Sequence, residues 1–148
     1  MSVKLTRSLD IALLTLIELA ASGKQLSAAG LSQALGAPRN HVAKIIHVLG
    51  RGGYIRTLRG KGGGIRLAKA PEAIRLKEII DLVEGPISLM SCTIDPGNCP
   101  LTPRCRLGRT FKEAQESMMK VFESRTLVDV LPVTSGRGAQ RQRNTRSS

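Results

Sequence analysis

The chain has 148 residues, 41% of them hydrophobic, a length that supports one domain with at most an appended helix. One Tyr, two Phe and no Trp leave an aliphatic core, which favours a helical protein. The net charge of +12 points to a polyanionic partner such as nucleic acid. The N-terminus resembles no signal peptide, and the apolar stretch at residues 11–21 is too short to span a bilayer. We therefore expect a cytoplasmic protein that does not associate with membranes.

The positive charge is concentrated in one part of the chain. Residues 19–71 include no aspartate or glutamate, so all eleven acids lie outside this window. A window of this length without counter-charge is unusual for an ordinary solvated surface, and it predicts where a polyanion binds. Its nine cations are Lys24, Arg39, Lys44, Arg51, Arg56, Arg59, Lys61, Arg66 and Lys69.

Three helices are predicted in the first third of the chain. Apolar spacing indicates a helix over residues 7–22 that ends at Gly23, and Ser27 and Gly36 delimit a second, short helix. Pro38 opens the third helix, because proline is preferred in a first helical turn. Two helices joined by a tight turn, the second with a polar outer face, form a helix-turn-helix signature. The buried stripe of the third helix is expected to be Val42, Ile45, Ile46 and Leu49.

A β-hairpin is predicted next, from YIRTLRG, the turn GKGGG and IRLAKA. With Arg59 and Lys61 at its tip, it is typical of the wing of a winged helix, and such a cation suits a narrow A·T-rich minor groove. A nucleotide phosphate loop is disfavoured, because the Lys-Ser/Thr pair and the following helix are missing. The predicted fold class is therefore mainly α: a winged helix-turn-helix with a small β-hairpin wing.

Two further helices are predicted beyond the wing. The first covers residues 76–84 and stops at Gly85-Pro86, and the second covers residues 106–124. The longer helix carries an apolar seam, as expected for a dimerisation helix. We divide the chain into a DNA-binding domain (1–84), a cysteine loop (85–105), a dimerisation helix (106–131) and a disordered basic tail (132–148). The seam consists of Leu107, Phe111, Ala114, Met118 and Phe122.

The cysteines of the chain are Cys92, Cys99 and Cys105, all within fourteen residues. An odd number cannot pair completely into disulfides, and three thiolates on a loop form a metal or cluster site that is one ligand short. A structural zinc site is an alternative, although paired Cys-x-x-Cys knuckles are absent. A cofactor-free thiol sensor is another, because arginines flank Cys105. A thiol enzyme has no support, because His41 and His47 both belong to the predicted DNA-binding face of the third helix.

The segments LTRSLDIAL and RGKGGGIRL and the three-cysteine loop resemble the Rrf2 family of bacterial winged-helix regulators over roughly residues 4–131. The resemblance implies a homodimer, with crossed C-terminal helices, that binds a palindromic operator in double-stranded DNA, most often as a repressor. It also implies a [2Fe–2S] or [4Fe–4S] cluster on Cys92, Cys99 and Cys105, which controls DNA binding in response to nitric oxide, iron or redox status.

The fourth ligand distinguishes branches of the family. The IscR-like branch has a histidine three residues after the last cysteine, and Gly108 occupies that position here. The NsrR-like branch uses an aspartate of the other subunit near the start of the first helix, which corresponds to Asp10. An ordinary first-turn acid that is favoured by the helix dipole remains the alternative for Asp10.

The residues predicted to contact DNA lie on the third helix and the wing. Arg39, Asn40, His41 and Lys44 are expected to reach the major groove, and Arg59 with Lys61 to enter the minor groove. Pro38 would set the start of the helix, and Arg51, Arg56 and Arg66 would contact phosphates.

Overall fold

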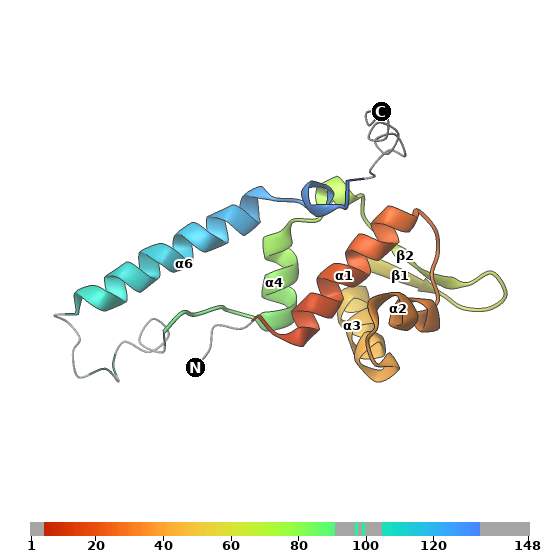
Figure 1. Ribbon diagram of the computed structural model, residues 1–148, viewed down its shortest axis with the longest axis horizontal. Coiled ribbons are helices and arrows are strands. Elements are labelled where there is room, and N and C mark those ends of the chain that lie inside the picture. The colour runs from red at the N-terminus through yellow and green to blue at the C-terminus, as the bar shows by residue number, and fades with distance from the viewer. Residues whose placement is uncertain (1–4, 91–96, 98, 100–104, 134–148) are drawn as a thin grey trace, which may run out of the picture.

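The computed structural model describes residues 5–90, 97, 99 and 105–133, and these residues form five α-helices and one antiparallel two-stranded hairpin (Figure 1). Cys92 and the tail from residue 134 onward lie outside the described residues. No helix of the described part is long and apolar enough to cross a membrane.

The first three helices begin and end where capping residues occur in the sequence. Helix α1 (Arg7–Ser22) ends at Gly23, which has a φ of +59°. Helix α2 (Ala28–Leu35) begins after Ser27, whose Oγ accepts the Gly30 N–H at 2.9 Å. Helix α3 is Arg39–Arg51, so Pro38 is the last residue before the helix and not its first. The ψ of Pro38 is 136°, and its carbonyl accepts the N–H groups of His41 and Val42.

The core lies where α1 packs against α3 and against helix α4 (Leu76–Glu84). Three of the four residues expected in the buried stripe of α3 are buried, whereas Ile46 is only half-buried at its edge. The remaining core is aliphatic, as the composition predicts. Its fully buried large side chains include Leu9, Leu16, Leu31, Leu49, Ile74, Ile79, Ile80 and Leu127.

The wing is a hairpin of β1 (Ile55–Leu58) and β2 (Gly64–Leu67), with Ile55 opposite Leu67 and Leu58 opposite Gly64. Strand β2 is also held by a bridge, close to the tip of the hairpin, that the sequence does not predict. Leu26 and Ile65 exchange two backbone hydrogen bonds, of 3.0 and 2.8 Å. The wing is therefore joined to the α1–α2 connection as well as to α3.

Helix α6 (Arg106–Ser124) extends away from the body and is anchored at its C-terminal end (Figure 1). The Leu76 N–H donates to the Arg125 carbonyl at 3.0 Å, and the Leu127 N–H donates to the Ile74 carbonyl at 2.8 Å. Two short 3-10 helices, η1 (Pro71–Ala73) and η3 (Leu127–Val130), flank this junction. They lie next to each other although 53 residues separate them in the chain.

The apolar residues of α6 divide between two neighbouring faces. None of its nineteen residues, all described, is buried. Met119 and Phe122 pack against the core, whereas Leu107 and Val121 are 53% and 57% exposed. The assignment of Phe122 to the seam is therefore wrong, because Phe122 turns toward the core of its own chain. Val121 continues the exposed seam in its place.

Candidate nucleic-acid interface and cysteine site

The outer face of α3 carries one continuous polar stripe. Asn40, Lys44, His47 and Arg51 follow one another at spacings of four, three and four, so they share one side of the helix. This side lies opposite the buried stripe, and all four residues are exposed. The predicted contacts Pro38, Arg39 and His41 are exposed beside it. His47, which the sequence assigns to the DNA-binding face without naming it as a contact, lies within this stripe.

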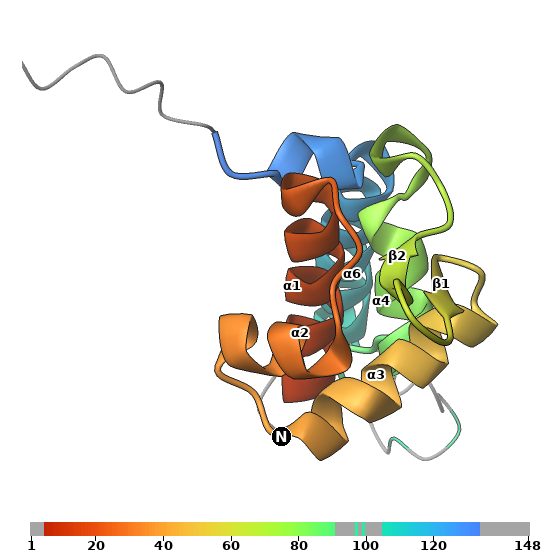
Figure 2. The same ribbon diagram turned by 90° about the vertical axis from the view of Figure 1, so that its right-hand side faces the viewer.

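The tip of the wing presents Arg59 and Lys61, both exposed. The tip needs glycine for two reasons. Gly60 and Gly62 have φ values of +94° and +80°. A Cβ on Gly63 would lie 2.3 Å from the Leu58 carbonyl oxygen. The glycine run therefore creates the turn that carries the two cations. Figure 2 shows the hairpin of β1 and β2 beside α3.

The cations of this surface are not neutralised by acids of the same chain. Residues 19–71 contain no acid, and the ion pairs within the described residues are Lys77–Asp81 on α4 and Lys112–Glu116 on α6. The predicted contacts on α3 and the wing thus keep their positive potential for an external anion. We refer to α2, α3 and the wing together as the reading head.

The root of the wing makes a polar contact with α4. The Tyr54 hydroxyl donates to Oε2 of Glu78 at 3.1 Å, and Nζ of Lys69 lies 4.4 Å from the centre of the Tyr54 ring. Burial, and next the hydrogen bond to Glu78, raise the pKa of Tyr54 to about 12. This contact connects both ends of the hairpin with α4.

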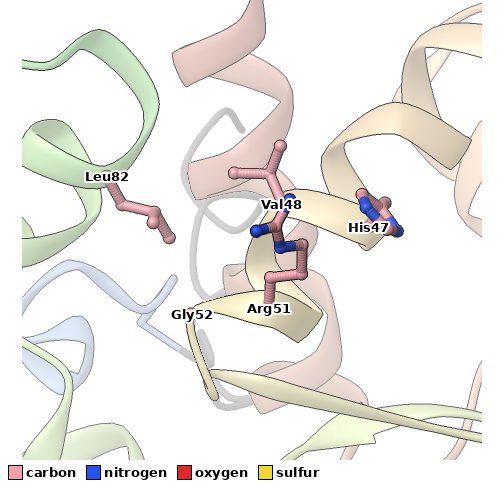
Figure 3. Close-up of a pocket in the computed structure, with 5 residues that line it drawn as sticks. All are labelled: His47, Val48, Arg51, Gly52 and Leu82. Atoms are coloured by element: carbon pink, nitrogen blue, oxygen red, sulfur yellow. The ribbon is translucent and has the colours of Figure 1, made fainter.

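A hollow of about 330 Å³ lies beside the C-terminal half of α3 and is lined by His47, Val48, Arg51, Gly52 and Leu82 (Figure 3). Its position follows from the close packing of α4 onto the end of α3. A Cβ on Gly52 would lie 2.7 Å from Cδ2 of Leu82. The φ of Gly52 is −72°, so space and not backbone conformation requires the glycine.

The described cysteines, Cys99 and Cys105, are both half-buried. Cys105 is the N-cap of α6, and its side chain makes no capping hydrogen bond. The first N–H groups and the positive dipole end of a nineteen-residue helix therefore begin at this residue. Half-buried thiols at such a position suit an anionic thiolate-ligated group. Among the described residues, which exclude Cys92, no three His, Cys, Asp or Glu side chains are grouped to hold a metal.

Asp10 is exposed on the first turn of α1. Figure 1 shows that this turn lies in the body of the molecule, whereas α6 begins at the far end of its projecting arm. Asp10 and Cys105 of one chain are therefore not neighbours. If Asp10 is a ligand, it has to come from a second chain.

A helix-turn-helix followed by a two-stranded wing, with exposed cations on both, defines a winged-helix DNA-binding protein. Residues 5–132 match the model of the Rrf2 family, described as an iron-dependent transcriptional regulator, and the chain belongs to this family. It is thus a DNA-binding transcriptional regulator and not an enzyme.

Solved structures confirm the fold. CymR, the global cysteine regulator of B. subtilis, has a TM-score of 0.72 at 24% identity, and the match covers 86% of this chain and 95% of that one. IscR of T. potens has a TM-score of 0.67 at 23% identity, with coverage of 87% and 86%. CymR of Staphylococcus aureus has a TM-score of 0.65 at 22% identity, with coverage of 82% and 93%. The chain is similar to all three in fold.

Proposed function

We propose that this regulator is a cytoplasmic homodimer that represses transcription from a palindromic operator, and that an iron–sulfur cluster sets its operator affinity. The observation that carries the proposal is the position of the cysteines. Cys105 occupies the N-cap position of α6, Cys99 lies half-buried nearby in the sequence, and Cys92 completes a set of three thiolates.

In the proposed complex, the stripe of α3 enters the major groove and the wing enters the adjacent minor groove. Asn40, His41 and Lys44 read base edges together with Arg39, and Pro38 fixes the helix start. Arg59 and Lys61 occupy the minor groove, and Arg51 contacts phosphate. The exposure of all these side chains and the absence of acids in residues 19–71 support this arrangement.

The dimer would form through the exposed seam of α6. A helix of nineteen residues with no buried side chain gains little from packing within its own chain. Leu107, Ala114 and Val121 are exposed along one face, and burial of this face against a second copy would supply the missing packing. A dimer also brings two reading heads to successive half-sites of one operator.

Cys92, Cys99 and Cys105 would hold the cluster, with Asp10 of the partner subunit as the fourth ligand, as in the NsrR-like branch. A bound cluster supplies redox chemistry and an iron that reacts with small molecules such as nitric oxide. The protein contributes the thiolates and the helix N-terminus that favours their negative charge.

The test is anaerobic purification of the full chain, followed by its visible spectrum and by iron and acid-labile sulfide analysis. We expect a coloured protein with matched iron and sulfide, and a colourless Cys99→Ala variant. Asp10→Ala should alter the spectrum or speed cluster loss, whereas the matched control Ser8→Ala, exposed on the same turn, should not. If reconstitution cannot produce colour, the cluster is excluded and a zinc or cofactor-free thiol regulator takes its place.

A further inference from the structure

Two arginines lie directly opposite each other on the wing. In the register of the hairpin, Arg56 of β1 pairs with Arg66 of β2, and both residues are exposed. Directly opposed residues of an antiparallel pair carry their Cβ atoms about 4.5–5.5 Å apart on one face of the sheet. Ile55 and Ile65, which precede them in the sequence, are buried, so the arginines belong to the face that is turned away from the core. The outer face of the wing therefore presents two cations side by side.

This arginine pair is not balanced by negative charge within the described chain. The whole hairpin lies within residues 19–71, which contain no acid, and the ion pairs of the described residues lie on α4 and α6. Like charges at directly opposed positions destabilise a hairpin. The pair thus lowers the stability of the free protein, and a bound anion would remove the repulsion. This arrangement indicates a binding role and not a structural one.

We propose that Arg56 and Arg66 together bind one phosphate group of the DNA backbone, an inference that rests on the DNA-binding arrangement proposed above and not on the cluster. The sequence predicts a phosphate contact for each arginine separately, whereas the register brings both to a single site. Two guanidinium groups at this spacing can converge on the oxygens of one phosphate through charge-assisted hydrogen bonds.

The position of the pair relative to the wing tip fits such a contact. Arg56 precedes Arg59 by three residues, which corresponds to about 10 Å of extended strand. With Arg59 in the minor groove, the pair would meet the sugar–phosphate backbone that borders this groove. The pair would then fix how deeply the wing enters the groove, because phosphate contacts set the register of a protein on the duplex.

The dependence of DNA affinity on salt counts the phosphates that each bound chain neutralises, at about 0.9 of logarithmic slope per phosphate. A duplex of arbitrary sequence is a sufficient probe, because phosphate contacts carry no sequence information. Arg56→Thr and Arg66→Thr should each nearly keep the natural slope, because the remaining arginine still neutralises the shared phosphate. The double variant should lower the slope by about 0.9. Arg109→Ala, which removes one exposed charge from α6, is the matched control and should not change the slope.

Two results of this titration would overturn the proposal. A decrease of about 0.9 in each single variant and about 1.8 in the double variant would mean that the arginines bind two separate phosphates. An unchanged slope in the double variant would mean that they bind none. If the natural protein itself shows no salt-dependent binding to the duplex, the proposed function fails, and not the phosphate site alone.

Thermal melts of the DNA-free variants separate a binding role from a structural one. Arg56→Glu replaces the repulsion across the hairpin with an attraction, so it should raise the melting temperature by about 1–4 °C. The same variant should bind the duplex more weakly than Arg56→Thr. Thr57→Glu, on the same strand with no arginine opposite, is the matched control and should raise the melting temperature less. An equal rise in both variants, or a lower melting temperature in Arg56→Glu, would refute the like-charge argument.

A free phosphate offers the same chemistry as the DNA backbone, and a titration with inorganic phosphate distinguishes the two. Against chloride at equal ionic strength, phosphate up to about 10 mM should not raise the melting temperature of the natural protein, because an exposed pair alone binds a small anion weakly. A saturable rise that Arg56→Thr abolishes would assign the pair to a free phosphate and overturn the assignment to DNA.

Discussion

The geometry of the wing tip can be tested by adding a single methyl group. In Gly63→Ala, the new Cβ would lie 2.3 Å from the Leu58 carbonyl oxygen and 2.9 Å from that of Gly60. Both neighbours are backbone atoms, so they cannot yield as a flexible side chain would. The hydrogen bond from the Gly63 N–H to the Gly60 carbonyl, 3.0 Å long, closes the same turn. The substitution therefore forces the turn that presents Arg59 to change shape.

Gly63→Ala is expected to lower the folding stability less than the operator affinity. An overpacked methyl group costs about 1–3 kcal/mol in a rigid core. The tip is exposed, however, and two residues after Gly63 the bonds between Leu26 and Ile65 keep β2 attached to the body. We therefore expect a loss near the lower limit, about 1 kcal/mol, which lowers the melting temperature by about 2–4 °C. Operator affinity should fall by about 1–3 kcal/mol, because Arg59 leaves its position.

The assay is fluorescence anisotropy with an operator duplex, alongside thermal melts of the same samples. Gly50→Ala is the matched control for stability, because a Cβ there meets nothing within 4 Å. At this exposed position in α3, alanine should raise stability by up to about 1 kcal/mol. If Gly63→Ala binds the operator with undiminished affinity, the reasoning that the glycine turn positions Arg59 is refuted.

Four further results are expected. Arg59→Ala should weaken operator binding by about 1–3 kcal/mol, mainly at A·T-rich flanks. Arg109→Ala, which changes an exposed arginine on α6, should not weaken it. Equal losses of affinity on every DNA sequence would make Arg59 a phosphate contact. Thr15→Val should raise the unfolding free energy by about 1 kcal/mol in urea titrations, because Oγ1 of this buried residue has no hydrogen-bond partner within the described structure. If stability does not rise, an acceptor or a water binds this hydroxyl. Thr110→Val, at an exposed position, is the control. Val121→Glu should raise the dimer Kd by about 100-fold in analytical ultracentrifugation through an unpaired charge on the seam. Lys120→Glu, an exposed position outside the seam, should not; an intact dimer in Val121→Glu would place the interface elsewhere. Stability should fall as pH rises from 10 to about 12, because the Tyr54 phenol ionises near 10 in the unfolded chain and near 12 in the folded one; urea titrations of Tyr54→Phe should lack this loss, and an identical decline in both proteins would refute the assignment.

Helix boundaries could be predicted because their signals are local. Ser27 caps α2 with its own side chain, and Gly23 and Gly36 take the left-handed conformation that ends a helix. Pro38 shows the limit of this reasoning. Proline suits both the first helical position and the residue before it, and the sequence does not distinguish the two.

Contacts between distant segments could not be predicted. Backbone groups, which every residue carries, form both the bridge between Leu26 and Ile65 and the hydrogen bond from Leu76 to Arg125. The two faces of α6 pose a similar problem. A period of 3.6 residues shows that Phe122 lies on the apolar side of the helix. It does not show whether that side packs against the same chain or against another.

The candidate DNA-contacting surface could be located from charge and periodicity, because an exposed cationic stripe is a property of one helix. The surroundings of the stripe depend on tertiary structure. Leu82 forms the hollow beside His47 and Arg51 only because α4 packs on Gly52, and no local pattern indicates that contact. The division of the chain into domains and the residue roles in the proposed complex stay predictions.

Helix α4 connects the segments on which the proposed control of DNA binding depends. Glu84, its last residue, accepts hydrogen bonds from both the N–H and the hydroxyl of Thr6, the N-cap of α1. Glu78 binds the Tyr54 hydroxyl at the root of the wing, and Leu82 contacts the end of α3. The chain that leads to the cysteines begins at Gly85, directly after this helix. Because this one nine-residue helix contacts α1, α3 and the wing, a displacement of α4 would shift the recognition helix and the wing together.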